Sequence, residues 1–155
     1  MPDFSLQTVL EYRHSVVEGL EIELSVLLNK EQEIKEGIEQ LNINKENILD
    51  EMKDVQKGNI DLNHLNQMKD NVKYLKVKIE EQHLALEELN KEIDAKRQEL
   101  TEAKQEEEVL VKLKEKMMSD FEEKVKKAED AAQDDIYIAQ AFQRSKNSKS
   151  EAGNV

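Results

Sequence analysis

The sequence predicts an all-α protein, an antiparallel two-helix coiled coil (helical hairpin) whose second helix is longer than its first. Three observations predict this fold. Apolar residues recur at alternating steps of three and four along two long stretches, a single break separates the stretches, and Gly, Pro and aromatic residues are rare. A 3.5-residue period places one narrow apolar stripe on a helix, and such a stripe needs another helix to cover it.

The second stretch has the clearest stripe, and neither Gly nor Pro interrupts residues 65–100. Gln82 and Lys96 are its two polar positions. The other faces are rich in Glu, Lys, Asn and Gln, so this helix has no second apolar surface to bury. The apolar positions of the stripe are Leu65, Met68, Val72, Leu75, Ile79, Leu86, Leu89, Ile93 and Leu100.

The first stretch carries a matching stripe, in a helix that Asp3 or Ser5 can cap. Glu31 and Lys45 share one heptad position of this stripe. They either fix the register by facing polar groups on the second helix, or extend their long side chains to water. The stripe runs through Leu6, Leu10, Arg13, Val17, Leu20, Leu24, Leu27, Glu31, Ile34, Ile38, Leu41, Lys45, Ile48, Met52 and Val55.

The break falls at residues 56–61. Gly58 suits the left-handed residue that ends many helices, and Asn59 or Asp61 can cap the next helix. A loop this short makes the two helices antiparallel neighbours. We therefore expect one coiled-coil domain over residues 1–155. Its parts are a first helix at about 4–56, a turn at about 57–61, a second helix at about 62–142 and a flexible, Ser-containing tail at about 143–155.

The two helices differ in length, which leaves part of the second helix uncovered. With the turn centred near residue 59, the numbers of facing residues sum to about 118, so Leu6 lies opposite about residue 112. Four-residue steps replace the strict heptads after Ala103, and this change relaxes left-handed supercoiling. Beyond that point the apolar residues spread around the helix and invite either a protein partner or another copy of the chain. They include Val111, Met118, Val125, Ala131, Ala132, Ile136, Tyr137, Ile138, Ala139, Ala141 and Phe142.

Charge and composition indicate proteins as the partners. The formal net charge of -12 disfavours binding to nucleic acid and to anionic membranes. No run approaches the roughly 18 apolar residues of a membrane-spanning helix, so we expect no direct membrane insertion. The chain has no cysteine and its first residues do not resemble a signal peptide, which favours a cytoplasmic location.

No motif for catalysis is present in the sequence. The four glycines are isolated and form no phosphate-binding loop, and His14, His64 and His83 belong to no metal-binding motif. The acidic runs at residues 106–108 and 134–135 read as solvated faces, because a two-helix protein offers no water-excluded cleft to shift carboxyl pKa values. We predict no enzymatic activity, no catalytic residue, no cofactor and no metal site.

The start of the chain resembles the FliJ family of the bacterial flagellar export apparatus. Members typically begin with F-x-L-x-x-[VL]-L, followed by an aromatic or polar residue and Arg or Lys. Residues 68–82, 97–103, 110–116 and 127–142 also resemble family segments in the same order, although Asn71 stands where the family often has an aromatic residue. The matching opening is Phe4-Ser5-Leu6-Gln7-Thr8-Val9-Leu10-Glu11-Tyr12-Arg13.

The resemblance implies a stalk protein of flagellar type III protein export, and thus a role in flagellum biogenesis and motility. FliJ-like proteins resemble the rotor stalk of rotary ATPases. They bind the export ATPase ring, promote its assembly and bridge it to the membrane export gate. They also bind chaperones of export substrates. We expect a monomer when isolated, held at the cytoplasmic face of the inner membrane through the apparatus. The implied ATPase-binding residues are Leu6, Leu10, Arg13, Lys114 and Phe121, and the implied gate-binding residues are Asn71, Leu75, Lys78 and Gln82. A structural role is an equal alternative for Leu6, Leu10 and Leu75, which lie on the stripes.

Two alternatives stay open. A generic helical-hairpin scaffold or prefoldin-like chaperone would bind clients through exposed apolar helix ends, but the prefoldin type also needs β-strands. In an intermolecular coiled coil, each helix would instead pair with another chain. Light scattering separates the latter from the hairpin, since a single chain has a mass of 18.0 kDa.

Overall fold

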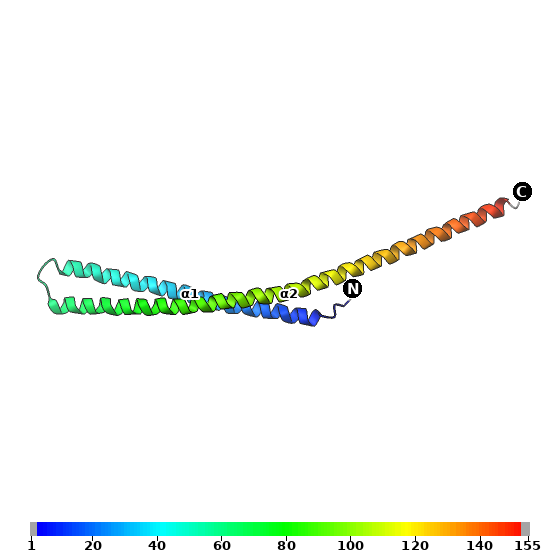
Figure 1. Cartoon of the computed structure of the whole chain (residues 1–155). Coiled ribbons are helices and arrows are strands. Elements are labelled where there is room, and N and C mark those ends of the chain that lie inside the picture. The colour runs from blue at the N-terminus through cyan, green and yellow to red at the C-terminus, as the bar shows by residue number, and fades with distance from the viewer. Residues whose placement is uncertain (1–2, 153–155) are drawn as a thin grey trace. The chain divides into compact units, whose positions relative to one another are not determined.

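Two helices make up the computed structural model, which describes the backbone of residues 3–152 and the side chains of residues 3–149. Helix α1 spans Gln7–Val55 and helix α2 spans Leu62–Ala152 (Figure 1). The described residues contain no β-strand. The predicted all-α fold with a longer second helix is therefore confirmed.

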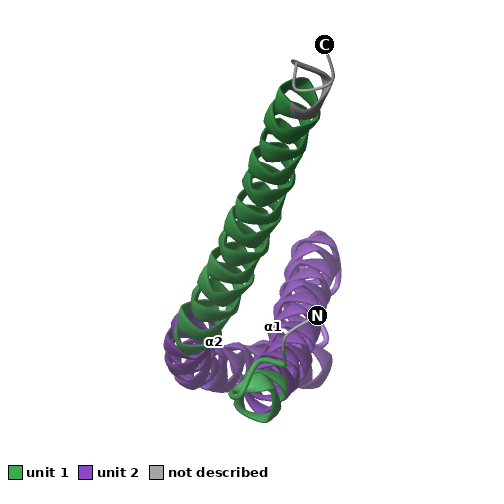
Figure 2. Cartoon of the chain, turned by 90° about the vertical axis from the view of Figure 1, so that its right-hand side faces the viewer, with its two compact units in different colours: residues 1–11, 106–155 green, residues 12–105 purple. Residues whose placement is uncertain are grey.

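The chain forms two compact units (Figure 2). Unit 2 is Tyr12–Gln105 and contains the turn, whereas unit 1 combines Met1–Glu11 with Glu106–Val155. These units subdivide the residues that we expected as one coiled-coil domain.

Unit 2 is an antiparallel hairpin in which α1 and α2 lie side by side (Figure 1). Val17 of α1 packs with Leu100 and Ala103 of α2, and Leu20 and Leu24 pack against this cluster. The residue numbers of facing pairs sum close to the expected 118, to 117 for Val17 and Leu100 and to 119 for Glu23 and Lys96. One chain thus supplies both helices of the coiled coil.

Except for Ala103, the core of unit 2 follows the predicted stripes. Ile93 is its most buried large residue, with 2% of its surface exposed. Burial of apolar surface along this seam is the main force holding the two helices together, because each helix is polar on its other faces. The buried residues are Val17, Ile38, Leu65, Met68, Val72, Leu89, Ile93, Leu100 and Ala103.

The turn confirms one expected cap and corrects another. Asp61 Oδ1 accepts hydrogen bonds from the backbone N–H groups of Asn63 at 3.1 Å and His64 at 3.3 Å, so Asp61 caps α2 as predicted. Gly58 was expected to be left-handed, but its φ is not positive. Instead, the N–H of Lys57 donates to the carbonyl of Asp54 at 3.2 Å, and this tighter i→i−3 bond closes the last turn of α1.

The expected flexible tail at about 143–155 is wrong for residues 143–152, because α2 continues through Ala152. Residues 143–152 hold Gln, Arg, Lys, Ala and Glu, which favour helix, and the first helix breaker after them is Gly153. Residues 153–155 lie outside the described part of the chain.

Part of α2 is uncovered, as expected from the unequal helix lengths. Half-buried side chains continue to Met118, a few residues beyond the expected limit near residue 112. Every side chain from Ser119 to Lys149 is exposed. This segment is therefore stabilised by its own backbone hydrogen bonds and by neighbouring charges, such as Lys127 and Glu123 at 3.3 Å.

Candidate partner-binding surfaces

The five residues that the family resemblance links to the ATPase fall into both units. Leu6, Leu10, Lys114 and Phe121 belong to unit 1, and Arg13 belongs to unit 2. Leu6 is 38% exposed and Phe121 is 41% exposed, whereas Leu10 and Lys114 are half-buried. Phe121 is thus the most accessible large apolar side chain among them.

Phe121 lines a shallow groove along one face of α2. Leu113 and Met117 share this groove, and the four-residue spacing of the three residues places them on neighbouring turns. The charged side chains beside them are Lys116, Asp120 and Lys124. Leu113 and Met117 were not among the predicted site residues, although their spacing from Phe121 was already visible in the sequence.

Arg13 is half-buried in unit 2 rather than enclosed in its core. Its guanidinium carbon lies 5.9 Å from the centroid of the Tyr12 ring, within the range of a cation–π interaction. Tyr12 itself is 61% exposed. The charge on the seam is therefore accommodated at the surface of the hairpin.

Two of the four predicted gate-binding residues line one groove across the hairpin. Asn71 and Leu75 of α2 share it with Tyr74 and with three residues of α1, which are Asn44, Asn47 and Ile48. Asn71 is exposed and Leu75 is half-buried. The groove offers the amide groups of Asn44, Asn47 and Asn71 beside the apolar surface of Ile48 and Leu75.

Tyr74 connects Lys78 to this groove. The Lys78 ammonium lies 5.6 Å from the centroid of the Tyr74 ring and 3.3 Å from Glu81 Oε2. Tyr74 is 61% exposed and was not among the predicted site residues, although the i, i+4 spacing of Tyr and Lys indicates such a pair. Gln82 is half-buried on the stripe, one helical turn beyond Lys78.

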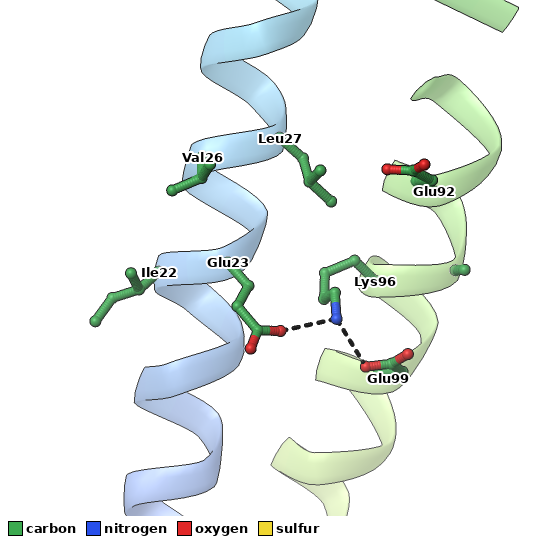
Figure 3. A pocket seen from close by; sticks show the side chains of 8 residues that line it. Ile22, Glu23, Val26, Leu27, Glu92, Lys96 and Glu99 are labelled. Carbon is green, nitrogen blue, oxygen red and sulfur yellow. Dashed lines mark hydrogen bonds and ion pairs between the residues drawn. The ribbon is translucent and has the colours of Figure 1, made fainter. Parts of the chain in front are cut away.

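Lys96, a polar interruption of the stripe, joins the two helices (Figure 3). Its ammonium donates to Glu23 Oε2 of α1 at 2.8 Å and to Glu99 Oε2 of α2 at 3.2 Å. These hydrogen bonds to carboxylates raise the pKa of Lys96 above its usual value of 10.5. Glu31, by contrast, bonds Lys35 of its own helix at 3.3 Å.

The raised pKa of Lys96 predicts a stability change at high pH. A group with a higher pKa in the folded state stabilises the protein below its unfolded pKa and loses that contribution as pH rises through the folded pKa. Urea unfolding of wild type and of the variant Lys96→Met would test this prediction. The free energy of unfolding of wild type minus that of the variant should stay constant from about pH 7 to 9 and fall above about pH 10.5.

Lys91→Met is the control for removing one lysine charge, because Lys91 bonds only along α2, to Glu88 at 3.1 Å. Its difference from wild type should change less with pH than that of Lys96→Met. A difference for Lys96→Met that stays flat up to about pH 12 would contradict the assigned link.

A comparison with protein families decides the identity of the chain. The family model described as flagellar FliJ protein matches residues 2–147. The chain belongs to the FliJ family. Membership makes this FliJ-family protein a component of the flagellar export apparatus and places it in a structural family rather than a family of enzymes. No curated protein and no solved structure shows a significant match to it.

Within residues 3–152, two kinds of feature are absent, a membrane-spanning helix and a cluster of metal-binding side chains. Neither helix of the FliJ-family protein contains an apolar stretch of the length and hydropathy required to cross a membrane. Within the same residues, no three His, Cys, Asp or Glu side chains are grouped so that they would hold a metal ion.

Proposed function

We propose that this FliJ-family protein is a stalk of the flagellar type III export apparatus. It binds the export ATPase ring, promotes ring assembly or activity, and links the ring to the membrane export gate and to substrate chaperones, at the cytoplasmic face of the inner membrane. The observation that carries the proposal is the uncovered helix from Ser119 to Lys149. Large apolar side chains exposed without a covering helix favour docking on another protein. In that segment they are Phe121, Val125, Ile136, Tyr137, Ile138 and Phe142.

The proposed ATPase-binding surface lies mainly in unit 1. Its residues there are Leu6, Leu10, Lys114 and Phe121, and Arg13 is proposed as a separate ATPase contact on unit 2. Phe121 supplies an aromatic group with apolar neighbours, and charged side chains border them, an arrangement of apolar centre and polar rim that is typical of protein interfaces. A two-helix stalk at the centre of a ring offers each ATPase subunit a different surface, and this difference biases the nucleotide states of the subunits.

The proposed gate-binding surface lies in unit 2 and comprises Asn71, Leu75, Lys78 and Gln82. Tyr74 extends it, because its exposed ring contacts the Lys78 ammonium. The groove at Asn71 and Leu75 also includes α1 residues, so a bound gate segment would touch both helices. This surface shares no residue with the proposed ATPase-binding surface.

The test measures ATP hydrolysis and ring assembly by the cognate export ATPase with and without the full chain. Wild type should increase both. Phe121→Ser should raise the concentration for half-maximal stimulation about tenfold, because an exposed aromatic contact of the interface is lost.

Ile43→Ser is the matched control for Phe121→Ser. Ile43 is 45% exposed and Phe121 is 41% exposed, so both changes remove one accessible apolar side chain. The control should stimulate the ATPase like wild type. Failure of the wild-type chain to promote either hydrolysis or assembly would refute the proposed function.

A further inference from the structure

Unit 2 has a surface groove that neither proposed interface uses (Figure 3). Ile22 is 67% exposed and Val26 is 49% exposed, although both are aliphatic and both lie off the seam between the helices. They do not serve the hairpin itself. The groove is lined by Ile22, Glu23, Val26 and Leu27 of α1 and by Glu92, Ala95, Lys96 and Glu99 of α2.

Ile22 and Val26 belong to a second row of residues on α1. The steps of this row alternate between three and four, every residue in it is exposed and none is charged, although 37% of the chain is charged. This spacing is that of a coiled-coil seam, and α2 already covers the other seam of α1. The row is Tyr12, Ser15, Gly19, Ile22, Val26 and Asn29.

The negative charge of the groove favours a positively charged partner. The lining includes three glutamates (Glu23, Glu92 and Glu99) against one lysine, and two of these carboxylates already hold Lys96. The groove is therefore negative beside its apolar surface. A second copy of this chain would bring the same acidic groove and its own net charge of -12, and these charges would repel.

We propose that the groove at Ile22, Val26 and Ala95 binds an amphipathic helix whose apolar stripe is flanked by Lys or Arg. Such a helix would pack its stripe on Ile22 and Val26 and place its basic side chains beside Glu92 and Glu99, making a three-helix coiled coil with unit 2. The inference goes beyond the proposed function, because it uses none of the residues assigned to the ATPase or to the gate.

The test uses the full chain and a fluorescent synthetic helix of about four heptads, with Leu and Ala on one stripe and Lys on both flanks. A second peptide has Glu in place of Lys. Fluorescence anisotropy should show binding of the Lys peptide that weakens as salt increases. The Glu peptide should bind at least about tenfold more weakly.

The variant Ile22→Ser/Val26→Ser should weaken binding of the Lys peptide by about tenfold or more. The matched control is Ile43→Ser/Val77→Ser, which also removes two exposed aliphatic side chains from unit 2, with exposures of 45% and 56%. It should bind like wild type. Circular dichroism of both variants should match wild type, because all four side chains are exposed.

Two results would overturn the inference. One is equal binding of the Lys peptide to wild type and to Ile22→Ser/Val26→Ser. The other is dimerisation of the wild-type chain that this variant abolishes, which would make a second copy the occupant. Because no ATPase is present in the binding assay, its outcome is separate from that of the hydrolysis test, in which Ile22→Ser/Val26→Ser should stimulate like wild type.

Discussion

Ile93→Ala is expected to lower the free energy of unfolding by about 2–5 kcal/mol. Ile93 is 2% exposed and is the most deeply buried large side chain of the seam. Truncation removes apolar contacts between α1 and α2 and leaves a cavity in the seam. The two helices can close this cavity only by moving toward each other, because no other layer of structure in the described part of the chain packs on them. Urea unfolding followed by circular dichroism at 222 nm measures the change.

The control for this prediction is Ile43→Ala. This substitution removes the same atoms as Ile93→Ala, but from a side chain that is 45% exposed. It should alter the free energy of unfolding by no more than about 0.5 kcal/mol, as is usual for surface substitutions. A loss below about 1 kcal/mol for Ile93→Ala would mean that the seam does not carry the stability of the hairpin.

Amide hydrogen exchange is expected to divide α2 into a protected part and an open part. Residues 89–100 include the buried Leu89, Ile93 and Leu100, so their amides should exchange only when the hairpin opens. Residues 119–149 have only exposed side chains, and a helix without tertiary contacts is marginally stable in water. Exchange in residues 119–149 should be roughly a thousandfold faster, corresponding to a difference of about 4 kcal/mol in opening free energy.

Hydrogen exchange also tests the proposed function. Addition of the cognate ATPase should slow exchange in residues 119–149 if this segment docks on the ring, whereas exchange in residues 89–100 should not change. Equal protection of both segments in the isolated chain would contradict the exposure of residues 119–149. Such a result would indicate that another copy covers the segment.

The helical hairpin was predictable from sequence because its determinants are periodic and local. The seam residues Val17, Ile93 and Leu100 are buried where the heptad pattern placed them. Asp61, one of the two residues predicted to cap the second helix, caps α2. Antiparallel pairing then follows from the short turn, and the contact between Glu23 and Lys96 agrees with the predicted sum of about 118 for facing residue numbers.

The ends of the helices were harder to predict, because several conformations satisfy the same composition. Residues 143–152 are polar and contain Ser, which suggested a tail, but their Lys, Arg, Gln and Ala residues also support a helix, and α2 continues through them. Gly58 permits a left-handed helix end without requiring it. The hydrogen bond from Lys57 to Asp54 ends α1 by another route.

The sequence by itself determined the two helices, their antiparallel order and the uncovered end of α2, since each depends on the spacing and number of residues along the chain. Only the tertiary structure decided which side chains beside the seam meet. The contact of Lys96 with Glu23 and the shared groove of Ile22, Val26 and Ala95 depend on how each helix is rotated about its own axis when the seam packs. That rotation is set by the fit of many side chains at once, and no single local pattern in the sequence specifies it.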